Sequence, residues 1–370
     1  MKNKKKYLLV IIMLVCICSC QRKHLIVQIG EKTTVNNDFG KELMEQGKFI
    51  EALTFYSEQL SEIQEVYGEQ SKELAELYNK LGNINSKLED FDSSNRYLEK
   101  AIAINEKINN NLGLALNYES LAKNYYYIED YEKALDYQTK SLPFMSDVYG
   151  QESNRMATCI VELGNIYRDK GDTDEALDNY MKALEIQKKV GGETSYAIGE
   201  TDINIGDLKY FIDDYDSAEK YYWEAVLIFE KELGSFHCET GKAYFNMGAV
   251  NERKKNYEAA LEYYQKALDA FNIDKSYNSL VALTYNNIGM VYHMQNDHIK
   301  AIEYTIKACR ISKDILPWTS SAQQDYKDYK YNLSAYYKES TGDGSEEGFE
   351  QWYKTTVENE DEEGRKDGDN

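Results

Sequence analysis

A small residue recurs every 40 to 42 positions along most of the chain, and this repeat limits the possible folds more than any other feature. The recurring residue, called the anchor below, is in successive repeats Gly40, Gly82, Ala122, Gly164, Gly206, Gly248 and Gly289. A second small residue follows each anchor by 12 positions, and a third follows by 19 except in the first repeat, where Gln59 stands. Such a period predicts an array of repeated structural units.

Each repeat is predicted to be a pair of helices. The chain has only 2 prolines in 370 residues, which leaves room for long helices because an interior proline disrupts the hydrogen bonding of a helix. Helices pack closely only where the side chains at their crossing are small, so we expect the anchors at the crossings and larger side chains between them. Most of the 33 tyrosines fall on such packing positions. One pair cannot bury its apolar face alone, so neighbouring pairs are expected to complete the core.

The pattern resembles the tetratricopeptide repeat, whose first helix carries Leu-Gly and whose second helix carries an aromatic residue and two alanines. Leu81-Gly82 on a first helix, and Tyr257, Ala260 and Ala267 on a second, are examples in this chain. The 42-residue period is similar to that of the kinesin-light-chain subclass. The resemblance covers residues 36–316 and implies an all-α fold, a right-handed α-α superhelical solenoid of about seven helix pairs.

The ends of the repeats carry further signals. A glycine lies 14 positions before the next anchor and is expected to end the preceding helix in a left-handed conformation, at Gly68, Gly150, Gly192 and Gly234. Three positions later come candidate caps for the next helix, Ser71, Ser153, Ser195 and His237. Pro143 predicts a kink or an early end of one second helix. Residues 317–357 are expected to form a degenerate eighth repeat that caps the array, and residues 358–370 an acidic disordered tail.

The first residues resemble an export signal. Residues 1–19 have the basic start and short apolar run of a signal peptide, and that run is well short of the ~20 residues that a spanning helix needs. The sequence Ile17-Cys18-Ser19-Cys20 resembles the lipobox of bacterial lipoproteins. The resemblance implies that Cys20 carries lipid, including palmitate, and that residues 20–35 form a linker. Gln21, the residue after Cys20, implies sorting to the outer membrane. An ordinary signal peptide and a short uncleaved anchor are the alternatives.

Composition and spacing argue against several kinds of chemistry. The net charge of −21 disfavours nucleic acid and anionic membrane surfaces, both of which attract Lys and Arg. No phosphate-binding glycine loop, nucleophile elbow or zinc motif occurs, so we expect no enzyme activity and no cofactor. The histidines are never three or four positions apart, the spacing that places two ligands on one helix face, so no metal site is predicted; they are His24, His237, His293 and His298. The cysteines of the array lie in different repeats and are predicted to be core residues without disulfides: Cys159, Cys238 and Cys309.

The resemblance places a partner-binding groove on the first helices, at positions six and three before each anchor and one and four after it. The candidate groove residues carried over in this way are Asn79, Asn83, Lys123, Tyr126, Asn165, Arg168, Tyr210, Phe245, Asn286, Met290 and His293. Asparagine can hydrogen-bond an extended peptide backbone, while the aromatic and methionine side chains offer apolar contacts. The Lys and Asn clamp with which chaperone-binding members hold a C-terminal carboxylate is not reproduced.

The sequence therefore predicts a non-enzymatic scaffold or adaptor, lipid-anchored on the exported side of a bacterial membrane, that binds a peptide or protein in this groove. Two alternatives stay open: a ligand-binding lipoprotein for glycan uptake, and the sensor component of a signalling system. Glycan-uptake proteins with these repeats carry large insertions that this array lacks. A sensor needs a spanning helix and an output domain, and neither follows Pro317 in the sequence.

Overall fold

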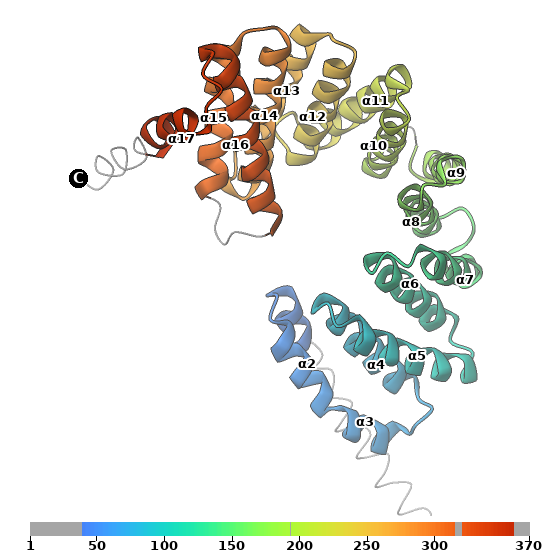
Figure 1. Cartoon of the computed structure of the whole chain (residues 1–370). Coiled ribbons are helices and arrows are strands. Elements are labelled where there is room, and N and C mark those ends of the chain that lie inside the picture. Colours follow the sequence, from blue (N-terminus) through green and yellow to red (C-terminus); the bar gives the residue numbers. More distant parts are fainter. Residues whose placement is uncertain (1–38, 193, 315–319, 359–370) are drawn as a thin grey trace, which may run out of the picture. The chain divides into compact units, whose positions relative to one another are not determined.

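The computed structural model describes residues 39–192, 194–314 and 320–358, and within these ranges the chain forms helices and turns without a β-strand (Figure 1). Successive helices pack as pairs, which confirms the predicted all-α helical-repeat fold. The regular pairs are α4 (Lys72–Lys87) with α5 (Phe91–Lys107), α6 (Asn111–Tyr127) with α7 (Tyr131–Tyr149), α8 (Asn154–Lys170) with α9 (Thr173–Gly191), α10 (Tyr196–Phe211) with α11 (Tyr215–Leu233), α12 (Cys238–Arg253) with α13 (Tyr257–Phe271), and α14 (Asn278–Met294) with α15 (His298–Asp314). A single 3₁₀ turn, η1 (Lys275–Tyr277), precedes α14.

The chain divides after Ile186 into two compact parts, called the N-terminal and the C-terminal part below. Each part is described by itself. The N-terminal part contains α2 to α8 and most of α9, and the C-terminal part contains α10 to η2.

The glycine anchors lie at the helix crossings, as predicted. A Cβ atom added at Gly164 would come within 2.6 Å of Tyr180, and one added at Gly206 within 2.5 Å of Tyr222. In both pairs the tyrosine lies 16 positions after the anchor, on the second helix, and is buried. Close packing of a large ring against a bare backbone therefore joins the two helices of a repeat.

Other tyrosines stack on one another between first and second helices. The rings of Tyr125 and Tyr137 are 5.4 Å apart and nearly parallel, and those of Tyr292 and Tyr304 are also 5.4 Å apart. Lys133 lies 4.8 Å from the centre of the Tyr125 ring. These contacts confirm that packing accounts for much of the tyrosine content.

The joints between repeats have positive φ angles, as predicted for glycine. Gly68, Gly150 and Gly234 have φ of 93°, 86° and 90°, but their ψ angles of 166°, 155° and 159° are extended rather than left-handed helical. This region of backbone conformation is open almost only to glycine.

The predicted caps differ among themselves. The side chains of Ser71 and Ser153 each accept a hydrogen bond of 3.2 Å from the backbone N–H three positions later in the chain. His237 caps α12 through Nδ1, which accepts from the Glu239 N–H at 3.2 Å. Ser195 occupies the cap position of α10, but its side chain makes no capping bond. Serine and histidine at the same position therefore satisfy the helix start in different ways.

Irregular sequence coincides with irregular structure in one place and not in another. In the first repeat a helix over residues 39–45 is followed by a divided second helix, α2 (Phe49–Glu58) and α3 (Leu60–Tyr67), and the division falls at Gln59, where the third small residue is missing. The helix α7, by contrast, continues through Pro143 to Tyr149. The expectation of an early end at Pro143 is wrong.

The last described helices pack onto the final regular pair. They are α16 (Ser320–Thr341), α17 (Glu346–Tyr353) and the π-helical turn η2 (Lys354–Glu358). Leu333 of α16 and Phe349 of α17 are buried in one cluster with Cys309 of α15. Helices are thus present within residues 317–357, where the degenerate eighth repeat was predicted.

Several predictions fall outside the described residues: the signal peptide, Cys20 and its linker, and the acidic tail beyond Glu358. Within the described ranges, no helix combines the length and the apolar character needed to cross a membrane. Cys159, Cys238 and Cys309 are buried free thiols, as predicted.

Candidate functional site

The predicted groove residues all lie on first helices, on α4, α6 and α8 of the N-terminal part and on α10, α12 and α14 of the C-terminal part. The side chain of Lys123 is exposed, and most of the others are half-buried. The predicted groove residues make local contacts with neighbouring helices in each part.

In the N-terminal part, amide side chains link α4 to α6. Asn83 Nδ2 donates to Asn79 Oδ1 at 3.0 Å, and Asn79 Nδ2 donates to Asn117 Oδ1 of α6 at 3.3 Å. Both Asn79 and Asn83 are half-buried. Asn117 is almost completely buried and was not among the predicted site residues.

A second polar link joins α6 to α8. The Tyr126 hydroxyl donates to a carboxylate oxygen of Asp169, and Arg168 Nε donates to the other oxygen of Asp169 at 2.8 Å. Burial and the hydrogen bond to Asp169 raise the pKa of Tyr126 to about 12, so its hydroxyl stays protonated and remains a donor. Asn165 accepts from the hydroxyl of Tyr180 at 2.7 Å. Asp169 stands one position beyond the inherited groove pattern, so that pattern alone did not reveal it.

Between these links lies a cluster of carboxylates around Cys159. Glu119 forms an ion pair with Arg155 and lies 3.7 Å from Cys159 Sγ. Burial, followed by the charge of Glu119, raises the pKa of Glu162, and burial raises the pKa of the Cys159 thiol to about 12. A thiol with a raised pKa is a poor nucleophile at neutral pH.

In the C-terminal part, Tyr210 and Phe245 are packed by aromatic rings. Tyr210 lies edge-on to Tyr215 at 5.6 Å, and Phe245 lies 5.5 Å from Tyr264. Asp207, at the groove position of α10, accepts from the hydroxyl of Tyr222 at 2.8 Å. Here too the groove positions are held by contacts with the second helix.

Two of the last three predicted residues, Asn286 and His293, contact the helix α16. Asn286 Oδ1 accepts from Asn332 Nδ2 of α16 at 3.1 Å, and Asn286 is only 6% exposed. Met290 Sδ lies 3.6 Å from Asn286 Nδ2. The ring of His293 stacks on Tyr336 of α16 at 4.5 Å. The helix α16 therefore covers part of the α14 face on which the sequence pattern placed groove residues.

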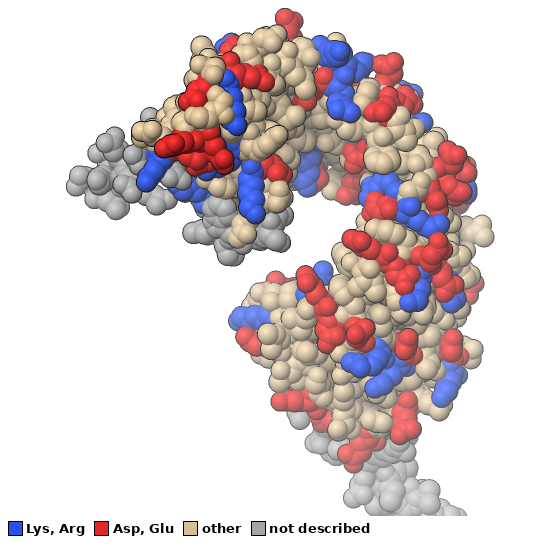
Figure 2. Space-filling model, in the orientation of Figure 1, with Lys and Arg blue, Asp and Glu red and all other residues tan. Residues whose placement is uncertain are grey.

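Charges are mixed over the surface. On the face drawn in Figure 2, Asp and Glu side chains occur along the array with Lys and Arg among them, and no continuous basic stripe crosses that face. Recognition on this face would therefore use local pairs of charges rather than a uniform field.

A protein-family model described as Tetratricopeptide repeat matches the chain over residues 34–107, 74–147, 113–189, 155–231, 197–273 and 239–314. No curated protein sequence matches the chain. The matched ranges together cover most of the helix pairs described above.

Two solved structures show a similar fold. BtubC (BKLC) from P. vanneervenii has a TM-score of 0.54 at 21% identity, over 62% of this chain and 91% of that one. A Signal Transduction ATPase with Numerous Domains from Pyrococcus horikoshii, which has a tetratricopeptide repeat sensor, has a TM-score of 0.64 at 20% identity, over 80% of this chain and 44% of that one. At these identities the likeness concerns the fold alone.

Proposed function

The chain belongs to the tetratricopeptide-repeat family, whose members generally act as non-enzymatic protein-interaction scaffolds, and we propose that it binds a protein or peptide partner along its first helices. The observation that carries the proposal is the pair of polar links from α4 to α6 and from α6 to α8. These links hold Asn79, Tyr126 and Arg168 in place before any partner arrives. Side chains that are already ordered lose less conformational entropy on binding.

The proposed contact surface is centred on the N-terminal part. Asn83 and the exposed Lys123 lie on neighbouring first helices, and both have hydrogen-bonding capacity for a peptide backbone or a carboxylate. Asn286 is less suitable, because it is only 6% exposed, whereas Asn83 is half-buried.

The test uses photo-crosslinkers placed at residue 123 on α6 or at Thr139, an exposed residue of the second helix α7. A specific partner should be captured from position 123 and not from position 139. The purified partner should then bind at least tenfold more weakly to the Asn83→Ala, Lys123→Ala double variant. The matched control is Thr139→Ala with Lys107→Ala, two exposed second-helix positions of the same part. Equal affinity of the double variant and the wild type would refute the groove assignment.

We further propose that the protein is exported and anchored by lipid on Cys20, on the exported side of a bacterial membrane. The residue after Cys20 favours the outer membrane as its location. The support is the lipobox-like sequence ending in Cys20. Two or more acyl chains give stable anchoring, whereas one chain alone binds only marginally. The Cys20→Ala variant should lose the lipid from its mature N-terminal peptide and leave the membrane fraction. A Cys20→Ala protein that is exported and stays membrane-bound would contradict the anchor.

A sensor role is the second candidate, and the specific observation in its favour is the tetratricopeptide repeat sensor of the Pyrococcus horikoshii protein. In that case ligand binding would change the affinity of the chain for a separate output protein. The scaffold and the sensor differ in one measurement: a scaffold's two partners bind independently, whereas a sensor's ligand alters the affinity for the second partner.

A further inference from the structure

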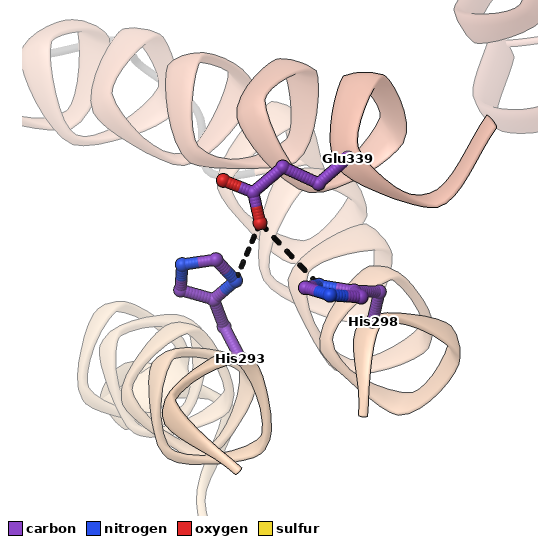
Figure 3. A group of neighbouring side chains, drawn as sticks. All are labelled: His293, His298 and Glu339. Atoms are coloured by element: carbon purple, nitrogen blue, oxygen red, sulfur yellow. Dashed lines mark ion pairs between the residues drawn. The ribbon is translucent and has the colours of Figure 1, made fainter. Parts of the chain in front are cut away.

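Three side chains from three helices of the C-terminal part converge on one point (Figure 3). They are His293 near the end of α14, His298 at the start of α15 and Glu339 near the end of α16. His293 Nδ1 lies 3.4 Å from Glu339 Oε2, and His298 Nδ1 lies 3.5 Å from the same oxygen. One ligand atom from each residue lies within 4.8 Å of the other two.

The two ring nitrogens lack hydrogen bonds. His293 Nδ1 and His298 Nδ1 are both buried atoms without a hydrogen-bond partner. Buried polar atoms are nearly always satisfied in folded proteins, so two such atoms aimed at one carboxylate oxygen require an explanation. Their separations from that oxygen exceed the usual length of about 2.7–3.2 Å for an N–H···O hydrogen bond.

The separations agree better with shared coordination of an ion. Around a tetrahedral zinc ion with bonds of about 2.0–2.2 Å, neighbouring ligand atoms lie about 3.3–3.6 Å apart. The two measured N···O separations, 3.4 and 3.5 Å, fall within that range. Two imidazoles and one carboxylate also form a known ligand set of zinc sites that keep a fourth position for water.

The surroundings hold one ligand in place and leave the cluster open on one side. The His293 ring stacks on the buried ring of Tyr336 at 4.5 Å, which fixes its orientation. The Glu339 side chain is half exposed, which leaves a side of the cluster open to water.

We propose that His293, His298 and Glu339 bind one divalent transition-metal ion, with Zn²⁺ as the ion that the ligand types and geometry fit best. The ion would join α16 to the α14–α15 pair and so fasten the C-terminal helices to the last regular repeat. This site is independent of the partner-binding surface proposed for the N-terminal part. It would also remove His293 from the set of residues available to a partner.

The test uses the full chain with Cys16→Ser, Cys18→Ser and Cys20→Ser, because thiols near the N-terminus could bind zinc themselves. After treatment with chelator and desalting, titration with Zn²⁺ alone is followed by calorimetry, and Co²⁺ is used for its absorption spectrum. We expect one ion per chain, a tetrahedral Co²⁺ spectrum and a higher melting temperature with Zn²⁺.

Substitutions of the three proposed ligands, and of one histidine outside the cluster, test which residues bind the ion. Glu339→Gln should weaken Zn²⁺ binding at least about tenfold, since even outer-shell changes cost about 10–100-fold. The double variant His293→Gln, His298→Gln should abolish saturable binding and the rise in melting temperature. The matched control is His237→Asn, a histidine that caps α12 and is replaced by another good capping residue.

Circular dichroism of each variant without metal establishes that the variant is folded. The Glu339→Gln change is made at a half-exposed side chain, so this variant keeps the test valid if the double variant unfolds. Absence of saturable Zn²⁺ binding by the parent chain would overturn the proposal. So would unchanged affinity in Glu339→Gln, because the carboxylate would then not be a ligand of the bound ion.

Discussion

The ring of Tyr264 lies against Gly248 so closely that a Cβ atom on residue 248 would come within 2.5 Å of it. Tyr264 is completely buried, and its hydroxyl donates to Glu252 Oε2 at 2.9 Å. The ring therefore cannot move away without breaking a buried hydrogen bond. In two repeats the residue 16 positions after the anchor is neither aromatic nor aliphatic: Gln138 follows Ala122, and Thr305 follows Gly289.

From this contact we predict that Gly248→Ala destabilises the protein by about 1–3 kcal/mol, the usual cost of overpacking a core. The loss is expected even though alanine favours a helix over glycine by about 1 kcal/mol. The midpoint of urea unfolding, followed by circular dichroism, measures the effect. The matched control is Gly344→Ala, where no atom lies within 4 Å of an added Cβ. A Gly248→Ala protein as stable as the wild type would refute the packing argument.

A joint glycine and a glycine inside a repeat should respond differently to substitution, because their backbone conformations differ. Gly150 has φ 86° and ψ 155°, whereas Gly171, at the end of α8, has φ 95° and ψ 5°. Asparagine tolerates the left-handed helical region but not the extended region at positive φ. We expect Gly150→Asn to lose about 1–3 kcal/mol of stability and Gly171→Asn clearly less. Neither glycine has an atom within 4 Å of an added Cβ, so a clash cannot explain a difference in thermal unfolding. Equal losses would contradict the assignment.

Asp202 should make stability depend on pH. It is buried on α10, its Oδ1 has no hydrogen-bond partner, and burial followed by the charge of Glu224 raises its pKa to about 7. An unfolded aspartate has a lower pKa, so the folded state retains the proton over a range in which the unfolded state has lost it. Its contribution to stability is therefore greatest at low pH and falls as pH rises from about 4 to 7.

We predict that Asp202→Asn is more stable than the wild type by about 2 kcal/mol at pH 8, and that this difference disappears near pH 4. Urea unfolding of both proteins at a series of pH values measures the difference. The matched control is Asp178→Asn on α9, an exposed carboxylate for which the difference should not vary with pH. A constant difference for Asp202→Asn would show that its carboxyl is not protonated in the folded state.

The packing of α16 should control access to Cys309. This thiol is completely buried in one cluster with Leu333, and burial raises its pKa to about 12. Leu333→Ala should cost about 2–4 kcal/mol locally and increase the rate at which a thiol reagent modifies Cys309. Mass spectrometry of the labelled peptides measures that rate, with Cys159 of the N-terminal part as an internal reference. Tyr331→Ala, at a position of α16 that is 77% exposed, is the matched control and should leave the rate unchanged.

The helix pairs were predictable because packing repeats the same residue types at fixed intervals. A small anchor, with further small residues 12 and 19 positions later, marks each helix pair, so the sequence indicated both helices and their crossing. The division of a helix at Gln59 also falls where the pattern is broken. The ψ angle of the joint glycines was not predictable, because a glycine accepts both regions of positive φ and only the direction of the next helix selects between them.

The candidate site was less predictable. His293 and His298 are five positions apart, and a search along a single helix face excluded them. They meet because the chain turns between α14 and α15, where Asn296 has a φ of 61°. Glu339 lies 41 positions after His298, on the helix α16, so no local spacing could reveal it. The burial of Asn286 likewise depends on Asn332 of α16, in a repeat whose pattern is degenerate.

The joints at Gly150 and Gly234 are nearly identical in conformation, and each lies 14 positions before an anchor. The anchors Gly164 and Gly248 and the tyrosine rings that pack against them therefore fall on the same side of a joint. A duplication or deletion in the gene with its ends at two such glycines would add or remove a complete pair and create no new core. The length of the array can consequently change in evolution in steps of 42 residues, while the first and last repeats keep their own sequences.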